Sequence, residues 1–121
     1  MILFMALLLP LSAIEMRADD KEAVIEIPIY RPEGERLGRA LVEIQAFYLD
    51  LMSCIQTSVS VDLGEVEVFV TNCSTGESWY DIFDSGLEMQ TILMISGTSG
   101  LYDIRYVTES GDVYEGSFII E

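Results

Sequence analysis

Three acidic residues, Asp81, Asp84 and Glu88, stand close together around an Asp-Ser-Gly segment that is typical of a turn. Carboxylate oxygens carried on loops are ligands that calcium prefers, so these side chains are candidates for a weak calcium site. The simpler interpretation is that they are solvated turn residues. Because neither an EF-hand spacing nor a glycine-rich phosphate loop occurs in the sequence, we expect no cofactor and assign no metal site.

Trp79 and Tyr80 are candidates for a binding site. They are neighbours on an expected strand, where successive side chains point to opposite faces of the sheet, so one of them can be exposed. An exposed aromatic ring could stack on a sugar or anchor a partner. A core tryptophan between two sheets is the favoured interpretation of Trp79.

The chain has no histidine at all. This removes the usual general base, the Ser-His and Cys-His nucleophile pairs, and the commonest ligands of zinc and iron. Pairs of carboxylates can still cleave glycosides, but nothing in the sequence marks two of the many acidic residues as such a pair. We therefore expect no enzyme activity and keep a carboxylate-based glycan hydrolase as a remote alternative.

The two cysteines, Cys54 and Cys73, lie in what the alternation predicts as a hairpin. Residues 53–61 and 65–72 each place apolar side chains on one face, and a tight turn at residues 63–64 pairs apolar with apolar throughout. That register sets Cys54 opposite Cys73 on the solvent face, so we predict a disulfide between them in an oxidising compartment. The alternative is two free thiols, which a one-residue bulge would separate.

The rest of the chain past residue 18 also alternates with a period of two, and turn residues recur at short intervals. In the first expected strand Pro28 predicts an edge position, since proline cannot donate to a ladder. We expect about seven or eight antiparallel strands and no helix, so two sheets must bury each other in an immunoglobulin-like β-sandwich. The further expected strands are residues 24–30, 41–48, 77–83, 88–95, 101–108 and 113–120.

The first fourteen residues are almost entirely apolar, in a run too short to span a bilayer as a helix. Residues 1–18 are predicted to be a secretory signal peptide, cleaved after Ala13 or Ala18, and residues 19–121 a single domain. A buried N-terminal strand or helix is the alternative. We expect export to the periplasm, the cell surface or the medium, with no transmembrane anchor after removal of the leader.

The chain is strongly acidic, with 21 Asp and Glu against 6 Lys and Arg and a formal net charge of −15. Removing residues 1–18 would take away one acidic and one basic residue, so the net charge would stay the same. A phosphate backbone needs a basic face, which excludes nucleic acid as an expected partner.

A resemblance to known proteins rests on residues 24–30, 72–80, 100–104, Gly111 and 116–118. With these residues the sequence resembles small exported Bacteroidetes proteins that carry a domain of unknown function. The ending is also similar to the C-terminal sorting domains of a bacterial secretion pathway, although Ile119, Ile120 and Glu121 stand where those domains have a basic tail. Both resemblances imply an immunoglobulin-like sandwich and export, and neither implies an activity.

Taken together, these features predict a non-enzymatic binding or interaction module at the cell envelope, whose partner is an unknown protein or glycan. The alternative is a structural or sorting element that secretion machinery recognises. The fold alone does not decide between them, since one sandwich architecture hosts many functions.

Overall fold

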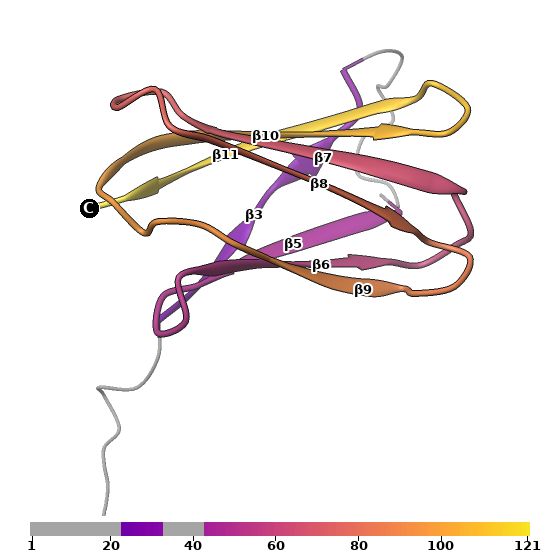
Figure 1. Cartoon of the computed structure of the whole chain (residues 1–121), viewed down its shortest axis with the longest axis horizontal. Coiled ribbons are helices and arrows are strands. Elements are labelled where there is room, and N and C mark those ends of the chain that lie inside the picture. The colour runs from indigo at the N-terminus through magenta and orange to yellow at the C-terminus, as the bar shows by residue number, and fades with distance from the viewer. Residues whose placement is uncertain (1–22, 33–42) are drawn as a thin grey trace, which may run out of the picture.

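The computed structural model describes residues 23–32 and 43–121, and within them the only regular structure is β-strand. Two antiparallel sheets pack face to face (Figure 1), which confirms the predicted β-sandwich. The predicted leader, residues 1–18, lies outside the described residues, as do residues 33–42.

One sheet has five strands in the order β4-β11-β10-β7-β8, and the other has four in the order β3-β5-β6-β9. The predicted strands agree with the observed ones to within about three residues at either end. The strands are β3 (Val24–Ile27), β4 (Ile29–Tyr30), β5 (Ile44–Leu49), β6 (Cys54–Val59), β7 (Glu65–Asn72), β8 (Ser78–Asp84), β9 (Gln90–Met94), β10 (Gly100–Thr108) and β11 (Val113–Ile120).

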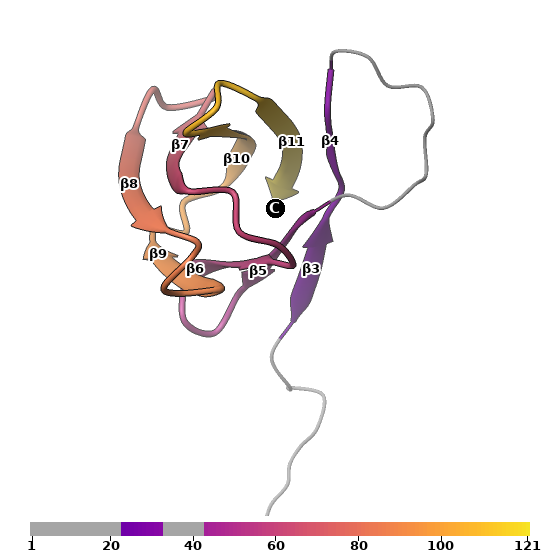
Figure 2. The same cartoon turned by 90° about the vertical axis from the view of Figure 1, so that its right-hand side faces the viewer.

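The first predicted strand is interrupted at Pro28, where the chain changes sheets. β3 pairs with β5 at the edge of the four-stranded sheet, and β4 pairs with β11 at the edge of the five-stranded sheet. Pro28 has no backbone N–H to give to either ladder, which fits a position between two edge strands. The predicted edge location is confirmed, and Figure 2 shows β4 set to one side of the sandwich beyond β11.

The predicted hairpin of residues 53–61 with 65–72 is wrong. β6 pairs with β5 and β9, whereas β7 pairs with β10 and β8, so the chain crosses from one sheet to the other between β6 and β7. Their apolar sides therefore face each other across the core rather than lying side by side in one sheet. Residues 60–64 are enough chain to bridge the roughly 10 Å between packed sheets.

The core lies between the two sheets and is rich in aromatic residues. Tyr102 stacks on Phe118 with ring centroids 5.0 Å apart, and Tyr48 stacks on Phe118 at 5.4 Å. One polar contact joins the sheets inside the core, a hydrogen bond of 2.6 Å between the Thr57 and Tyr106 hydroxyls. Burial raises the pKa of Tyr106 well above its usual value, so the phenol stays neutral and keeps this bond.

Candidate functional site

A row of five side chains crosses the outer face of the five-stranded sheet, one from each strand. The backbone register sets Tyr80 on β8 beside Phe69 on β7, Phe69 beside Arg105 on β10, Arg105 beside Glu115 on β11, and Glu115 beside Tyr30 on β4. We call these five residues the outer row. With neighbouring strands about 4.8 Å apart, four steps span about 19 Å from the first tyrosine to the last.

Every member of the outer row except Tyr80 lines a hollow of about 410 Å³ on this face. The charged side chains of the hollow come from its two middle strands, β10 and β11, and the aromatic side chains come from β7 and β4 on either side of them. The lining residues are Tyr30, Phe69, Thr71, Asp103, Ile104, Arg105, Glu115, Gly116 and Ser117.

Contacts with neighbouring side chains fix the orientation of Phe69 and Tyr80 in the outer row. The Arg105 guanidinium lies over the Phe69 ring, 5.2 Å from its centroid, and the Phe69 and Tyr80 rings are tilted with centroids 5.2 Å apart. The Tyr80 hydroxyl donates a 2.8 Å hydrogen bond to Oε2 of Glu67, and this bond raises the pKa of Tyr80. A ring that is already fixed in position loses less conformational entropy when a ligand stacks on it.

Arg105 is the charged centre of the outer row. Within residues 23–32 and 43–121, its guanidinium forms no ion pair and no hydrogen bond, and its contact is with the face of Phe69. A guanidinium carries five N–H donors in one plane. Stacking on an aromatic ring leaves the edge of that plane directed at solvent, where those donors can bind a ligand.

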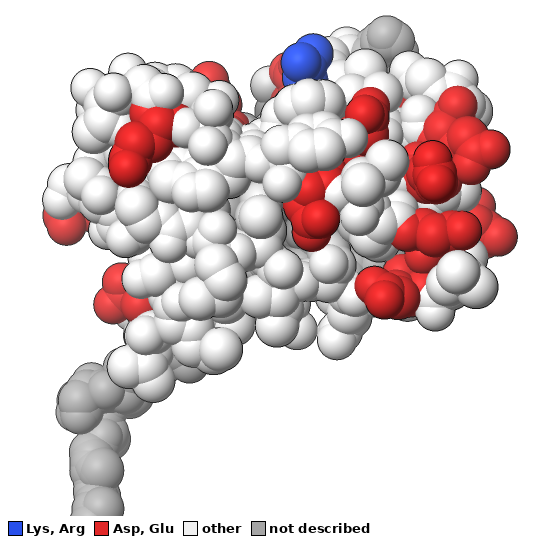
Figure 3. All heavy atoms as spheres, in the orientation of Figure 1, with Lys and Arg blue, Asp and Glu red and all other residues white. Residues whose placement is uncertain are grey.

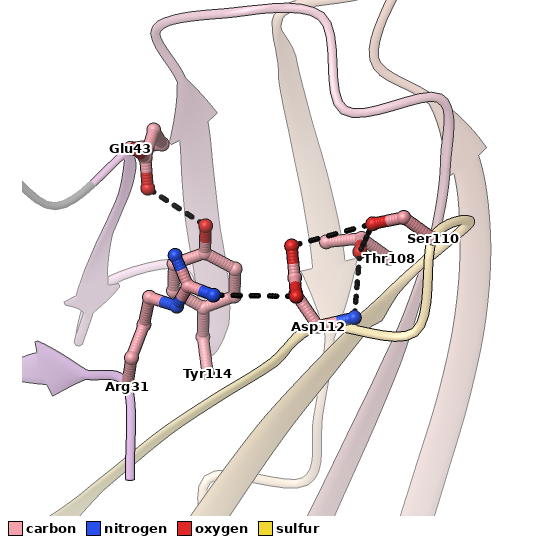
Figure 4. Close-up of polar contacts among 6 residues, drawn as sticks. All are labelled: Arg31, Glu43, Thr108, Ser110, Asp112 and Tyr114. Atoms are coloured by element: carbon pink, nitrogen blue, oxygen red, sulfur yellow. Dashed lines mark hydrogen bonds and ion pairs between the residues drawn. The ribbon is translucent and has the colours of Figure 1, made fainter. Parts of the chain in front are cut away.

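Tyr30, the last member of the outer row, is positioned by a polar cluster at the end of β4. Figure 4 shows Arg31 reaching Asp112 in the β10–β11 turn at 3.2 Å and lying over the Tyr114 ring. The Tyr114 hydroxyl in turn donates a 2.7 Å bond to Oε1 of Glu43. These contacts tie the end of β4 to β11, although β4 pairs with β11 through only two residues.

The structure does not assemble the three calcium candidates into a metal site. Oδ1 of Asp84 accepts a bond from the backbone N–H of Gly86, and Oδ1 of Asp81 accepts one from the N–H of Ile82. Glu88 is exposed, and its backbone N–H donates to the carbonyl of Asp84. In the part of the chain that the structure describes, no three His, Cys, Asp or Glu side chains are grouped to hold a metal.

Acidic side chains gather at one end of the sandwich, on the right in Figure 3. That end carries the β6–β7, β8–β9 and β10–β11 connections, which contain Asp62, Glu88, Glu109 and Asp112. Some of these carboxylates satisfy backbone donors: Oε1 of Glu109 accepts from the N–H of Glu65 at 3.0 Å. Their roles there are those of turn residues.

Trp79 and Tyr80 point to opposite faces of β8, as the sequence predicts. Trp79 is half-buried, packs against the core and stacks on Tyr102 with centroids 6.1 Å apart. Tyr80 lies on the outer face and is 52% exposed. The interpretation of Trp79 as a core residue is therefore confirmed, and Tyr80 is the one of the pair that a ligand can reach.

The predicted disulfide is not present, because the register on which it depended is wrong. Cys54 begins β6 in the four-stranded sheet and is buried, opposite Leu49 and Met94. Cys73 follows β7 in the other sheet, is exposed, and its thiol donates to Oδ2 of Asp103 at 3.3 Å. This hydrogen bond is the main cause of a raised pKa at Cys73.

We predict that the intact mass of the folded protein is the same with and without reductant. A thiol-alkylating reagent should label Cys73 and leave the buried Cys54 unlabelled until the protein is unfolded. Asp103→Asn should speed labelling at Cys73, since it removes the carboxylate that stabilises the protonated thiol. A mass lower by two protons without reductant would mean that the sulfurs are bonded.

Four members of the outer row, Tyr30, Phe69, Arg105 and Glu115, were missed by sequence reasoning. Each stands at an outward position of an expected strand, so alternation alone places it on the surface. What gathers them is the pairing of β7 with β10, which connects segments far apart in the chain. Because the prediction paired β7 with β6, it could not place Phe69 beside Arg105.

The described residues contain no helix that could cross a membrane. No family model matches the chain, and no curated protein matches it. One solved structure with a similar fold is a DUF3244 family protein with an immunoglobulin-like β-sandwich fold from Bacteroides vulgatus. The match has a TM-score of 0.62 at 12% sequence identity and covers 82% of this chain and 100% of the other. At that identity the likeness concerns the fold alone, and by fold this chain is an immunoglobulin-like β-sandwich.

Proposed function

We propose that this protein is a non-enzymatic binding module of the cell envelope and that it binds through the outer face of the five-stranded sheet. The observation that carries the proposal is the outer row, a line of aromatic and charged side chains that crosses all five strands. Exposed aromatic side chains beside a few polar groups are typical of recognition sites. Tyr30 and Tyr80, at the two ends, are 55% and 52% exposed.

We propose no catalysis because the proposed binding site lies on an open sheet face. The chain has no histidine, and the carboxylates of the hollow, Asp103 and Glu115, lie on an open sheet face. Catalysis by carboxylates draws on a site that excludes water and fixes the reacting atoms. An open face supplies stacking and hydrogen bonds, which are sufficient for binding.

The envelope location is supported by the predicted leader at residues 1–18 and by the acidic composition, which suits an exposed compartment. A solved structure of similar fold comes from a Bacteroides species, in line with the resemblance of the sequence to small exported Bacteroidetes proteins. The partner in that setting is an envelope protein or glycan.

Site-directed crosslinking in the native cell tests the proposed surface. A photo-crosslinking amino acid is placed at Ser117, which lines the hollow, or at Gln45, which is exposed on the outer face of the four-stranded sheet. We expect a defined adduct from Ser117 and none from Gln45. Adducts from Gln45 alone, or equally from both positions, would contradict the assignment of the five-stranded face.

A further inference from the structure

We propose that the ligand of the outer row is a neutral glycan chain that lies across the strands, a proposal that rests on the function proposed above. Sugar rings have apolar C–H faces, which stack on aromatic side chains, and hydroxyl edges, which both donate and accept hydrogen bonds. The outer row offers partners for both.

The spacing of the aromatic residues favours a chain over a single sugar. Tyr80 and Tyr30 stand at opposite ends of the row, about 19 Å apart at the usual strand separation, with Phe69 between them. One sugar ring is too small to reach both tyrosines. Successive units of a polymer can stack on each in turn, so affinity should increase with chain length.

The polar residues of the hollow match the hydroxyl groups of a sugar. Arg105 carries donors that no described residue uses, and Asp103 and Glu115 beside it are acceptors. Thr71 and Ser117 add hydroxyls that can do either. This mixture of donors and acceptors suits a ligand whose own groups are hydroxyls.

The charge of the face argues for a neutral glycan. Among the described residues, the carboxylates of Glu67, Asp103 and Glu115 lie on the same outer face as the Arg105 guanidinium, in a chain whose net charge is −15. A uronate or sulfated polymer would meet repulsion along most of its length. Binding of a neutral chain should also change little with salt, because no ion pair drives it.

The central part of the row does not suit a peptide that adds a strand. β7 and β10, which carry Phe69 and Arg105, are each paired with strands on both sides, so their backbone groups are already bonded. Strand addition needs an open edge. Recognition at the centre of this face must therefore use side chains, as stacking on a sugar does.

Affinity electrophoresis and calorimetry test the proposal on the full chain. The probes are a neutral glucan, mannan, xylan and galactan, with a polyuronate and a sulfated glucan as anionic comparisons. We expect at least one neutral polymer to bind and neither anionic polymer to do so. Tyr80→Ala and Tyr30→Ala should each weaken binding about tenfold, in the range found for anchoring aromatic residues.

Four further variants separate the contributions of the ring, the hydroxyl and the guanidinium to binding. Tyr80→Phe keeps the ring and should retain most of the affinity. Arg105→Lys keeps the charge but loses the planar fork, and should weaken binding nearly as much as Arg105→Gln. Ile92→Ala is the matched control, because Ile92 is 50% exposed on the outer face of the other sheet, and it should leave binding unchanged.

Failure to bind any neutral polymer, or binding that survives Tyr80→Ala and Tyr30→Ala, would overturn the glycan proposal. The proposed function fails separately, when Ser117 gives no specific crosslink in the cell. A specific Ser117 adduct with a protein, together with no glycan binding, would reject the ligand class and keep the binding surface.

Discussion

Replacing Asn72 with alanine should lower the free energy of unfolding by about 3 kcal/mol, the largest effect that we expect from a single polar side chain. Asn72 is fully buried at the end of β7. Its Oδ1 accepts hydrogen bonds from the backbone N–H groups of Ser74 and Thr75 at 2.8 and 3.2 Å. Its Nδ2 donates to the carbonyl of Ser99 at 3.2 Å. The variant would leave three backbone groups without these partners.

Urea unfolding of Asn72→Ala, with Thr71→Ala as a control in the same strand, measures this effect. Thr71 is half-buried on the outer face, so its truncation should cost well under 1 kcal/mol. The Asn72 variant should also loosen the β7–β8 turn and the β9–β10 connection together, because this one side chain joins them. A loss no greater than that of the control would mean that water replaces the three bonds.

Gly116→Ala should lower the free energy of unfolding by about 1–3 kcal/mol through overpacking. Gly116 is buried on β11, opposite Ile29 of β4. A methyl group there would lie 2.5 Å from the carbonyl oxygen of Pro28 and 2.8 Å from Cδ1 of Ile29. Because one of these atoms belongs to the backbone, β4 itself must move to make room.

The displacement of β4 gives Gly116→Ala a second expected consequence. Tyr30 on β4 closes the outer row, so a shifted β4 should weaken ligand binding even under conditions where the variant is fully folded. Ile119→Ala is the control, since Ile119 is 58% exposed on the same strand and does not line the hollow. A Gly116 variant with unchanged stability and binding would show that β4 does not pack on β11 as described.

Strand positions were predictable because alternation and turn chemistry agree along most of the chain. The predicted strands at residues 65–72 and 113–120 have the same bounds as β7 and β11. The alternation in residues 101–108 and 113–120 also matches the burial along β10 and β11, where Tyr102, Ile104 and Phe118 are buried. Each of these features depends on local sequence.

Strand pairing was less predictable, because alternation has the same appearance in a hairpin and in two facing sheets. Val59 and Val68 both point into the core, as the hairpin model requires, yet they belong to different sheets. The predicted contact between the two cysteines depended on that pairing, so it was wrong as well. The turn residues at 60–64 fit either connection, so they could not decide it.

Most of the candidate site could not be predicted either, because it depends on strand pairing. Tyr80 was identified from its type and its neighbour Trp79, because an adjacent aromatic pair on a strand must place one ring outside. No feature of the neighbouring sequence marks Arg105 or Phe69 as a binding residue. Their contact arises from the antiparallel pairing of β7 with β10, two strands that are not neighbours in the sequence.

Hydroxyl-radical footprinting of the protein in its native envelope, compared with the purified protein, tests the binding surface most directly. Tyr30, Phe69 and Tyr80 report on the five-stranded face, and Ile92 and Met94 report on the opposite face. We predict that the three aromatic residues are protected in the envelope while Ile92 and Met94 are oxidised as in the purified protein. Protection of Ile92 and Met94 with full oxidation of the three aromatic residues would contradict the account.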